Sequence, residues 1–257
     1  MEIIIISLVS FLASLLTFFS GFGLGTILMP VFALFFDVEV AIALTGIVHL
    51  LNNLFKMTII GKKATWRIVI KFGFPAIIGA FIGAYILMYF FNSSAWITYN
   101  LGDKICEITP VKIIIAVMIF SFAILELLPF YKNLSFSENK LYLGGVVSGF
   151  FGGLSGHQGA LRSAFLIKCN LTKESFIATG IIIASIVDVS RISVYFTKYS
   201  KIDFEENYSL LLFAIGFAFF GALIGKKLLT KITIDFIHIA VSIMLILLSI
   251  VLGLGII

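Results

Sequence analysis

Long apolar runs separated by short polar breaks constrain this chain more than any other feature. About 20 apolar residues in a helix span the hydrocarbon core of a membrane, and such runs occur at 40–60, 68–91, 174–197, 208–226 and 233–255. The runs show no alternation of apolar and polar residues, so they predict helices rather than barrel strands. With 61% hydrophobic and 12% charged residues, an ordinary soluble domain is excluded. The predicted fold class is an all-α polytopic membrane protein.

The remaining compositional features predict no cofactor and no metal site. Cys106 and Cys169 lie far apart and in no metal or redox spacing. The run at 3–19 is interpreted as a first helix, because Met1 and Glu2 do not provide the basic start of a signal peptide. The net charge of +5 comes from basic residues at the ends of apolar runs, which is typical of membrane anchors. Nucleic acid is therefore not an expected partner.

Two glycine-rich breaks divide the chain into similar halves. Gly25 corresponds to Gly159 at an offset of 134 residues, and the Gly-Ala-x-x-Gly element at 79–83 recurs at 221–225. We therefore predict a first repeat over 1–130 and a second repeat over 141–257, each built from a broken helical hairpin and three transmembrane helices. The first contains a hairpin at 3–36 and helices at 40–60, 68–91 and 111–130. The second contains a hairpin at 141–168 and helices at 174–197, 208–226 and 233–255.

The distribution of basic residues predicts the orientation. One set of loops carries Lys62, Lys63, Arg67, Lys71, Lys132, Lys140, Lys168, Lys173, Lys226, Lys227 and Lys231, and the opposite loops carry only Lys104, Lys112, Lys198 and Lys201. The first set is predicted to be cytoplasmic. The two repeats are then inverted, and both termini are expected to be extracellular or periplasmic, in a multi-pass protein of the cell membrane. Each hairpin is expected to be re-entrant, with two slanted crossings as the alternative.

The glycine breaks are predicted to bind an anion, because a broken helix leaves backbone N–H groups unpaired at the positive end of a helix dipole. Arg162 can hold an oxyanion with two parallel hydrogen bonds, and His157 can bind an anion or pass a proton. In the alternative, the glycines only permit tight packing, His157 makes a structural hydrogen bond and Arg162 extends to the headgroups. The predicted substrate-binding residues are Gly21, Gly23, Gly25, Thr26, Ser155, Gly156, His157, Gln158, Gly159 and Arg162.

A second polar set lies on the segments at 40–60 and 174–197. Asp188 and Arg191 are three residues apart on one helical face and are predicted to form an internal ion pair. Asn53 and Lys56 form a weaker echo in the first half, and His49 belongs to the same polar stripe. A role in coupling or gating and a purely structural role both remain open for this set.

The segment at 21–30, GFGLGTILMP, resembles the glycine-rich signature of the sulfite exporter TauE/SafE family. The duplicated organisation and the repeated Gly-Ala-x-x-Gly element are similar to that family as well. The second break departs from the pattern, with His157, Gln158 and Arg162 present and with Ala164 where a proline is common. The resemblance implies transport of small sulfur-containing or organic anions, without ATP hydrolysis and with proton coupling.

The predicted function is secondary transport of a small anion, such as sulfite, a sulfonate or another organic or sulfur oxyanion, by alternating access. The expected partners are this anion and the lipid bilayer, with a homodimer left open. The runner-up is an intramembrane enzyme that uses His157, Asp188 and nearby serines, although the HExxH and GxSxG motifs are missing from the sequence. A membrane accessory subunit or an anion channel is the third alternative.

Overall fold

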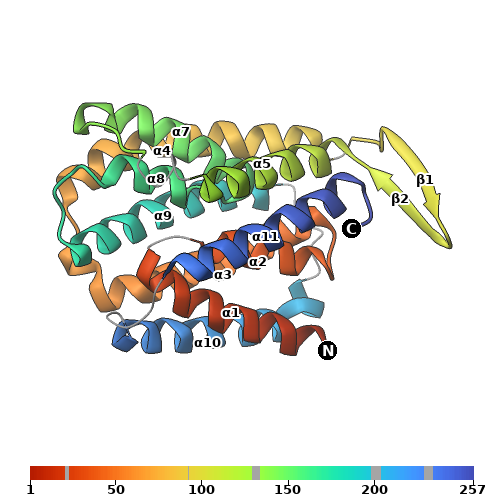
Figure 1. Cartoon of the computed structure of the whole chain (residues 1–257), viewed down its shortest axis with the longest axis horizontal. Coiled ribbons are helices and arrows are strands. Elements are labelled where there is room, and N and C mark those ends of the chain that lie inside the picture. The colour runs from red at the N-terminus through yellow and green to blue at the C-terminus, as the bar shows by residue number, and fades with distance from the viewer. Residues whose placement is uncertain (21–22, 92, 129–133, 198–203, 229–233) are drawn as a thin grey trace.

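The structure, a computed structural model, describes residues 1–20, 23–91, 93–128, 134–197, 204–228 and 234–257. Helices run along the longest dimension of the molecule, and both termini lie at the end from which a two-stranded hairpin projects (Figure 1). In the described part of the chain, the helices long and apolar enough to cross a membrane are Val38–Lys63, Trp66–Phe90, Pro110–Leu127, Lys173–Phe196 and Asn207–Lys227. The chain is thus a predominantly helical, multi-pass membrane protein.

The helices follow the apolar runs in order. The first half contains α1 (Glu2–Ser20), α2 (Leu24–Ala33), α3 (Val38–Ile60), η1 (Gly61–Lys63), α4 (Trp66–Phe90) and α5 (Pro110–Leu127). The second half contains η2 (Glu138–Lys140), α7 (Leu141–Ser155), α8 (Gly159–Leu166), α9 (Lys173–Phe196), α10 (Phe204–Leu228) and α11 (Ile234–Gly253). Helices α5 and α9 begin at threonine caps, where Thr109 and Thr172 accept hydrogen bonds from backbone N–H groups of the first turn.

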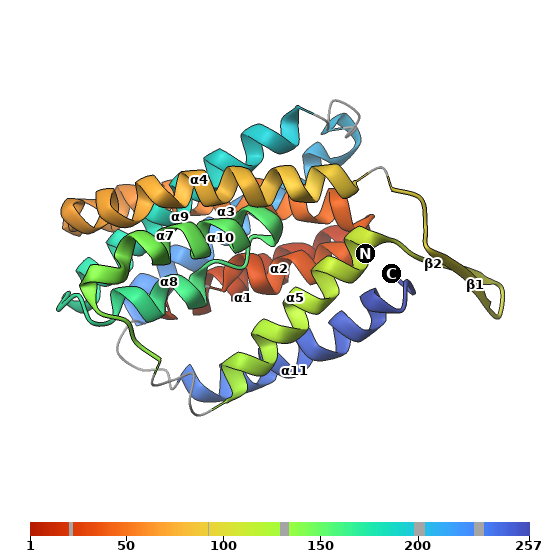
Figure 2. The ribbon, with the colours of Figure 1, turned by 90° about the horizontal axis from the view of Figure 1, so that it is seen from above.

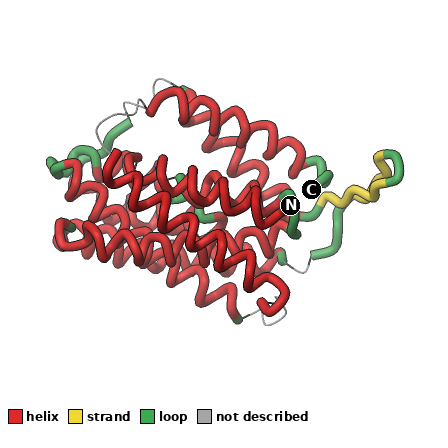
Figure 3. The backbone as a smooth tube through the Cα atoms, turned by 90° about the horizontal axis from the view of Figure 1, so that it is seen from below, coloured by secondary structure: helices red, strands yellow, loops and turns green. Residues whose placement is uncertain are grey.

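A short antiparallel hairpin, β1 (Ile97–Leu101) and β2 (Lys104–Ile108), is the part of the fold that the all-α prediction missed (Figure 3). Tyr99 lies opposite Cys106, and the two-residue turn between the strands contains Gly102 at φ +62°. Glycine followed by aspartate between two runs rich in β-branched and aromatic residues is a hairpin signal. The signal was overlooked because the segment is a short interruption between two strongly apolar helices.

The two helix breaks produce two helical hairpins that enter the bundle from opposite ends (Figures 1 and 2). Helix α1 begins at the end that carries the termini, and the link from α2 to α3 lines a surface hollow together with residues 255–257 at that end. The second hairpin begins and ends at the other end of the bundle. There Glu138, just before α7, forms ion pairs with Arg67 at 3.1 Å and Lys71 at 3.4 Å on α4.

Glycines hold α4 against α7 and α1 against α10. A Cβ on Gly79 or Gly83 would lie 2.1 Å from a backbone carbonyl oxygen of α7. A Cβ on Gly221 or Gly225 would lie 2.3 or 2.9 Å from a carbonyl oxygen of α1. The repeated Gly-Ala-x-x-Gly elements therefore make close helix contacts, as expected for small residues in membrane helices. Helices α3 and α9 pack on each other between these pairs.

Candidate functional site

A buried ionic network joins α3 to α9. Asp188 Oδ2 lies 2.5 Å from His49 Nδ1, and Asp188 Oδ1 accepts a hydrogen bond from Arg191 Nε at 3.0 Å. Arg191 Nη2 lies 2.9 Å from the same oxygen. Because a carboxylate only accepts hydrogen bonds, His49 Nδ1 is the donor. The predicted Asp188–Arg191 ion pair is therefore present, and His49, which is 139 residues from Asp188 in sequence, is its third member.

Glycines make room for the Arg191 guanidinium. A Cβ on Gly46 of α3 would lie 3.4 Å from Arg191 Cζ, and a Cβ on Gly156 would lie 2.9 Å from Arg191 Nη1. Gly156 also ends α7 with φ +82°, in the left-handed region that favours glycine. We predicted Gly156 as part of a substrate site, but the structure places a protein cation, Arg191, against it.

The two helix breaks lie next to each other. A Cβ on Gly25 would lie 3.8 Å from the carbonyl oxygen of Gly156 and 3.8 Å from His49 Cδ2. Gly23 precedes α2 with φ +110°, and Thr26 lies half-buried in the first turn of that helix. Gly21, which was also predicted to bind substrate, lies outside the described residues. The breaks therefore meet beside the ionic network, as a shared site requires.

Arg162 of α8 and Gln158, directly before that helix, pack inward on α9. Arg162 is only 3% exposed and lies beside Gly180, where a Cβ would be 3.4 Å from its Nε. The interpretation that Arg162 extends to the headgroups is therefore wrong. Gln158 donates a hydrogen bond from Nε2 to the Ala184 carbonyl oxygen at 3.5 Å, and Gly159 begins α8 directly after it.

His157 lies on the other side of the second break, against α5. Its Nδ1 lies 3.0 Å from Ser155 Oγ, and its ring stacks on Phe122 at a centroid distance of 6.3 Å. Its hydrogen bonds go to Ser155 in the same break and do not join two helices, and Nε2 is buried with no partner in the described part of the chain. Among the described residues, no hydrogen bond joins His157 to Asp188, whose carboxylate is occupied by other partners.

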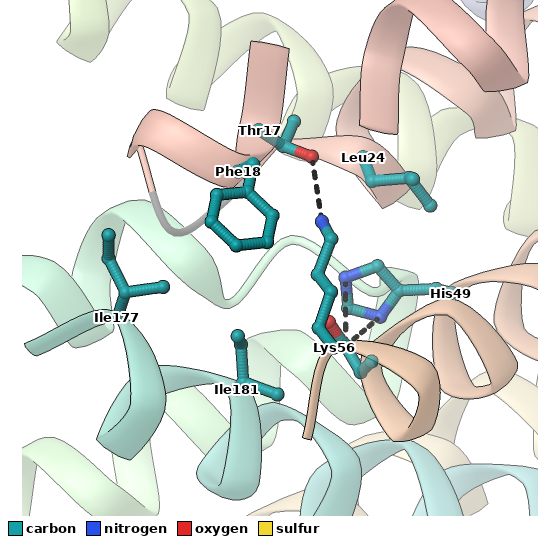
Figure 4. Close-up of a pocket in the computed structure, with 8 residues that line it drawn as sticks. Thr17, Phe18, Leu24, His49, Lys56, Ile177 and Ile181 are labelled. Carbon is teal, nitrogen blue, oxygen red and sulfur yellow. Dashed lines mark hydrogen bonds between the residues drawn. The ribbon is translucent and has the colours of Figure 1, made fainter. Parts of the chain in front are cut away.

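A small cavity opens beside the network, between α1, α2, α3 and α9 (Figure 4). It has an empty volume of about 280 Å³, most of it too narrow for a water molecule. The remaining space holds about one water molecule. One wall is apolar and the other is polar. The cavity is lined by Thr17, Phe18, Leu24, His49, Asn53, Lys56, Ile177 and Ile181.

Lys56 places its side-chain amine in this cavity. Its side chain is buried, and Nζ donates a hydrogen bond to Thr17 Oγ1 at 3.4 Å beside the Phe18 ring (Figure 4). With the Asn52 amide oriented to satisfy its neighbours, Asn52 Oδ1 accepts from Nζ at 3.1 Å. Within the described ranges, no carboxylate lies within 4.0 Å of Nζ. Lys56 is therefore a buried amine with no carboxylate partner among the described residues, and a positive charge on it is costly in the absence of a bound anion.

The predicted echo of the Asp188–Arg191 pair has a different geometry. Asn53 Nδ2 lies 3.3 Å from His49 Nδ1, whereas Lys56 contacts Thr17 and Asn52 instead of Asn53. Our prediction of a substrate site did not include Thr17. Its hydroxyl near the end of the first apolar run was the available signal, but the sequence did not indicate that it would meet α3.

Comparison with known proteins yields a family. No curated protein matches the chain, and no solved structure matches it. The family model for sulfite exporter TauE/SafE matches residues 6–252, which include both helix breaks, the ionic network and the Lys56 cavity. The chain therefore belongs to the sulfite exporter TauE/SafE family.

Proposed function

We propose that this chain is a secondary transporter that carries a small anion across the cell membrane by alternating access. The observation that carries the proposal is Lys56, a buried amine that has no carboxylate partner in the described part of the chain and lies in a cavity beside the meeting point of two helix breaks. Membership of an exporter family supports the functional class. Sulfite, a sulfonate or another small sulfur or organic oxyanion is the proposed cargo.

The chemistry of the cavity favours a small oxyanion. An ammonium group offers three hydrogen-bond donors, and Lys56 uses only some of them on Thr17 and Asn52. Asn53 adds an amide donor on the same wall. Asp188 and Arg191 neutralise each other outside the cavity, so the charge of the site comes from Lys56 and from His49 when it is protonated.

Helix packing supports the inverted-repeat part of the proposal. The two broken hairpins enter from opposite ends, and the contact of α4 with α7 has its counterpart in the contact of α10 with α1. The hairpin of each half thus packs on a helix of the other half, which is expected when two related halves of opposite orientation interlock. We propose that the halves rock about the cavity, that the basic loops face the cytoplasm and that both termini face the opposite side.

His49 supports proton coupling. Its Nδ1 donates to Asp188, which leaves the rest of the ring at the cavity wall near Lys56. A second proton on His49 would be stabilised both by Asp188 and by an anion beside Lys56. Anion and proton would then bind cooperatively, and loss of either one would promote release of the other. We therefore assign the coupling role to His49 rather than to His157.

The test is flux in liposomes that contain the purified protein. Labelled sulfite, methanesulfonate and other small oxyanions are supplied under imposed proton gradients, and the proposal expects saturable uptake of at least one anion. Lys56→Met should lower that uptake by about tenfold or more, because a charge-assisted hydrogen bond is lost. Lys62→Met, which removes an exposed lysine of η1, is the matched control. Absence of saturable uptake across the panel, or equal uptake by Lys56→Met and wild type, would refute the proposal.

A further inference from the structure

A line of buried hydroxyl groups leads away from the Lys56 cavity along α1. Ser7, Ser10, Ser14 and Thr17 follow one another at intervals of three, four and three residues, which places them on one helical face. None of the four is more than 6% exposed. We call these residues the hydroxyl stripe. Over ten residues an α-helix rises about 15 Å, so the stripe covers about half the thickness of a membrane.

The inner end of the stripe belongs to the cavity. Thr17 Oγ1 accepts the hydrogen bond from Lys56, and Ser14 Oγ lies 3.0 Å from the Asn52 side-chain amide. The stripe is therefore continuous with the buried cation that needs a counter-ion. A charged group on one end distinguishes it from serines that merely fill a helix interface.

The outer end of the stripe has unused hydrogen-bonding capacity. Ser7 Oγ and Ser10 Oγ are both buried, and neither has a hydrogen-bond partner in the described part of the chain. Unpartnered hydroxyls in a dry interior cost free energy, and serines that hold membrane helices together normally bond across the interface or to their own backbone. These two hydroxyls point to a ligand that is bound in another conformation.

Comparison of the two halves shows that helix packing does not require the hydroxyls. The glycines of α4 and α10 contact carbonyl oxygens on α7 and α1 that are 135 residues apart, Val146 against Phe11 and Phe150 against Leu15. At this offset Ser10, Ser14 and Thr17 correspond to glycines at 145, 149 and 152. The glycines at 145 and 149 approach the backbone of α4 closely. The α1–α10 interface thus carries hydroxyl groups at positions where the corresponding α4–α7 interface has glycines.

We propose that the hydroxyl stripe is the path of the anion between the Lys56 cavity and the membrane face at which α1 begins. The inference rests on the proposed function and deepens it by locating one half of the route. Ser10 and Ser7 donate hydrogen bonds to a small oxyanion and replace part of its water shell when that side is open. The buried state of all four side chains means that the described conformation is closed on this side.

Cysteine accessibility tests the path directly. In a Cys106→Ser, Cys169→Ser background, Ser10→Cys is treated with a methanethiosulfonate reagent that carries a sulfonate group and does not cross membranes. Intact cells and inverted vesicles expose the two faces in turn. Ala13→Cys is the matched control, because Ala13 is equally buried on α1 and lies at the edge of the same face, beside the line of hydroxyl groups rather than on it. From the face at which α1 begins, Ser10→Cys should react about tenfold faster than Ala13→Cys, since modification follows thiol exposure. Methanesulfonate should slow this reaction.

Anion flux through Ser10→Ala is a second measurement, and it would not change if the Ser10 hydroxyl had only a structural role. Because the Ser10 hydroxyl has no partner in this conformation, its removal should leave stability unchanged or slightly higher. The path predicts that flux falls by about fivefold for the loss of one hydrogen bond to the moving anion. The path is wrong, and the proposed function stands, if wild type carries the anion but the two tests of Ser10 fail. In that outcome Ser10→Ala has the same flux as wild type, and Ser10→Cys reacts no faster than Ala13→Cys from either face. If wild type carries no anion, both are wrong.

Discussion

Replacing Lys56 with methionine should raise stability and weaken anion binding at the same time. Methionine has nearly the same length as lysine and carries no charge, so it fills the same space against Phe18 and Thr17. A residue that only supports the fold would lose stability when it is replaced. A buried cation whose counter-ion is a bound anion should instead raise stability when methionine replaces it.

The size of each effect follows from the surroundings of Lys56. Its Nζ has two neutral oxygen partners, and no carboxylate in the described residues compensates its charge. Replacing buried charges with apolar groups of similar volume gains about 1–4 kcal/mol, and each kcal/mol raises Tm by about 2–4 °C for a chain of this length. Loss of a hydrogen bond between the ammonium and an anion costs about 1.5–3 kcal/mol, which weakens binding roughly 10- to 150-fold.

The assay is thermal unfolding of the purified protein with and without methanesulfonate or sulfite. At an anion concentration about 100 times Kd, wild type should gain about 2.7 kcal/mol. Lys56→Met should unfold at a higher temperature without anion, and its gain at the same anion concentration should fall to about 0.3–1.4 kcal/mol. Lys56→Arg should retain the shift, and Lys62→Met should behave as wild type. A variant that is less stable than wild type and still gains as much from the anion as wild type does would refute the assignment of Lys56.

Three further outcomes test the rest of the description. Asp188→Asn should lower stability by about 3–5 kcal/mol because it leaves Arg191 buried without its partner, and adding Arg191→Met should recover much of that loss in a double-mutant cycle measured by thermal unfolding. Gly149→Ala should lower stability by about 1–3 kcal/mol, because its Cβ would lie 2.2 Å from a carbonyl oxygen of α4. Gly216→Ala, whose Cβ meets no atom within 4 Å, should raise stability by about 1 kcal/mol. Equal melting temperatures for the two variants would contradict the packing. His157→Phe should leave the anion-dependent shift unchanged, since the ring stacks on α5 away from the cavity; loss of the shift would return His157 to the site.

Most of the helical architecture could be predicted from the sequence because each helix is a local pattern. An apolar run of about 20 residues has few alternatives in lipid. The breaks before Leu24 and Gly159 were predictable for the same reason, since glycine clusters interrupt helices wherever they occur. The strands at 97–108 were missed because their signal depends on a two-residue turn rather than on a long run.

The site was predictable only where it is local. Asp188 and Arg191 are three residues apart on one helix, so their pairing follows from helical geometry. The contact of Lys56 with Thr17 joins residues 39 apart, and it depends on how α1 leans on α3. His157 was predicted to face the substrate because polar groups in membrane helices usually do. The sequence does not specify the side of the break to which a ring turns, and here the ring turns toward Phe122.

The exchange of helix partners between the two halves has a consequence for biosynthesis. Helix α1 packs through close backbone contact on α10, whose glycines lie more than 200 residues downstream. During translation the first hairpin therefore lies in the membrane without its partner α10 until nearly the whole polypeptide has been made. Its serines are exposed to lipid or to the insertion machinery during that time. Helix α7, by contrast, meets an α4 that is already in place, so the second hairpin can dock as soon as it is made.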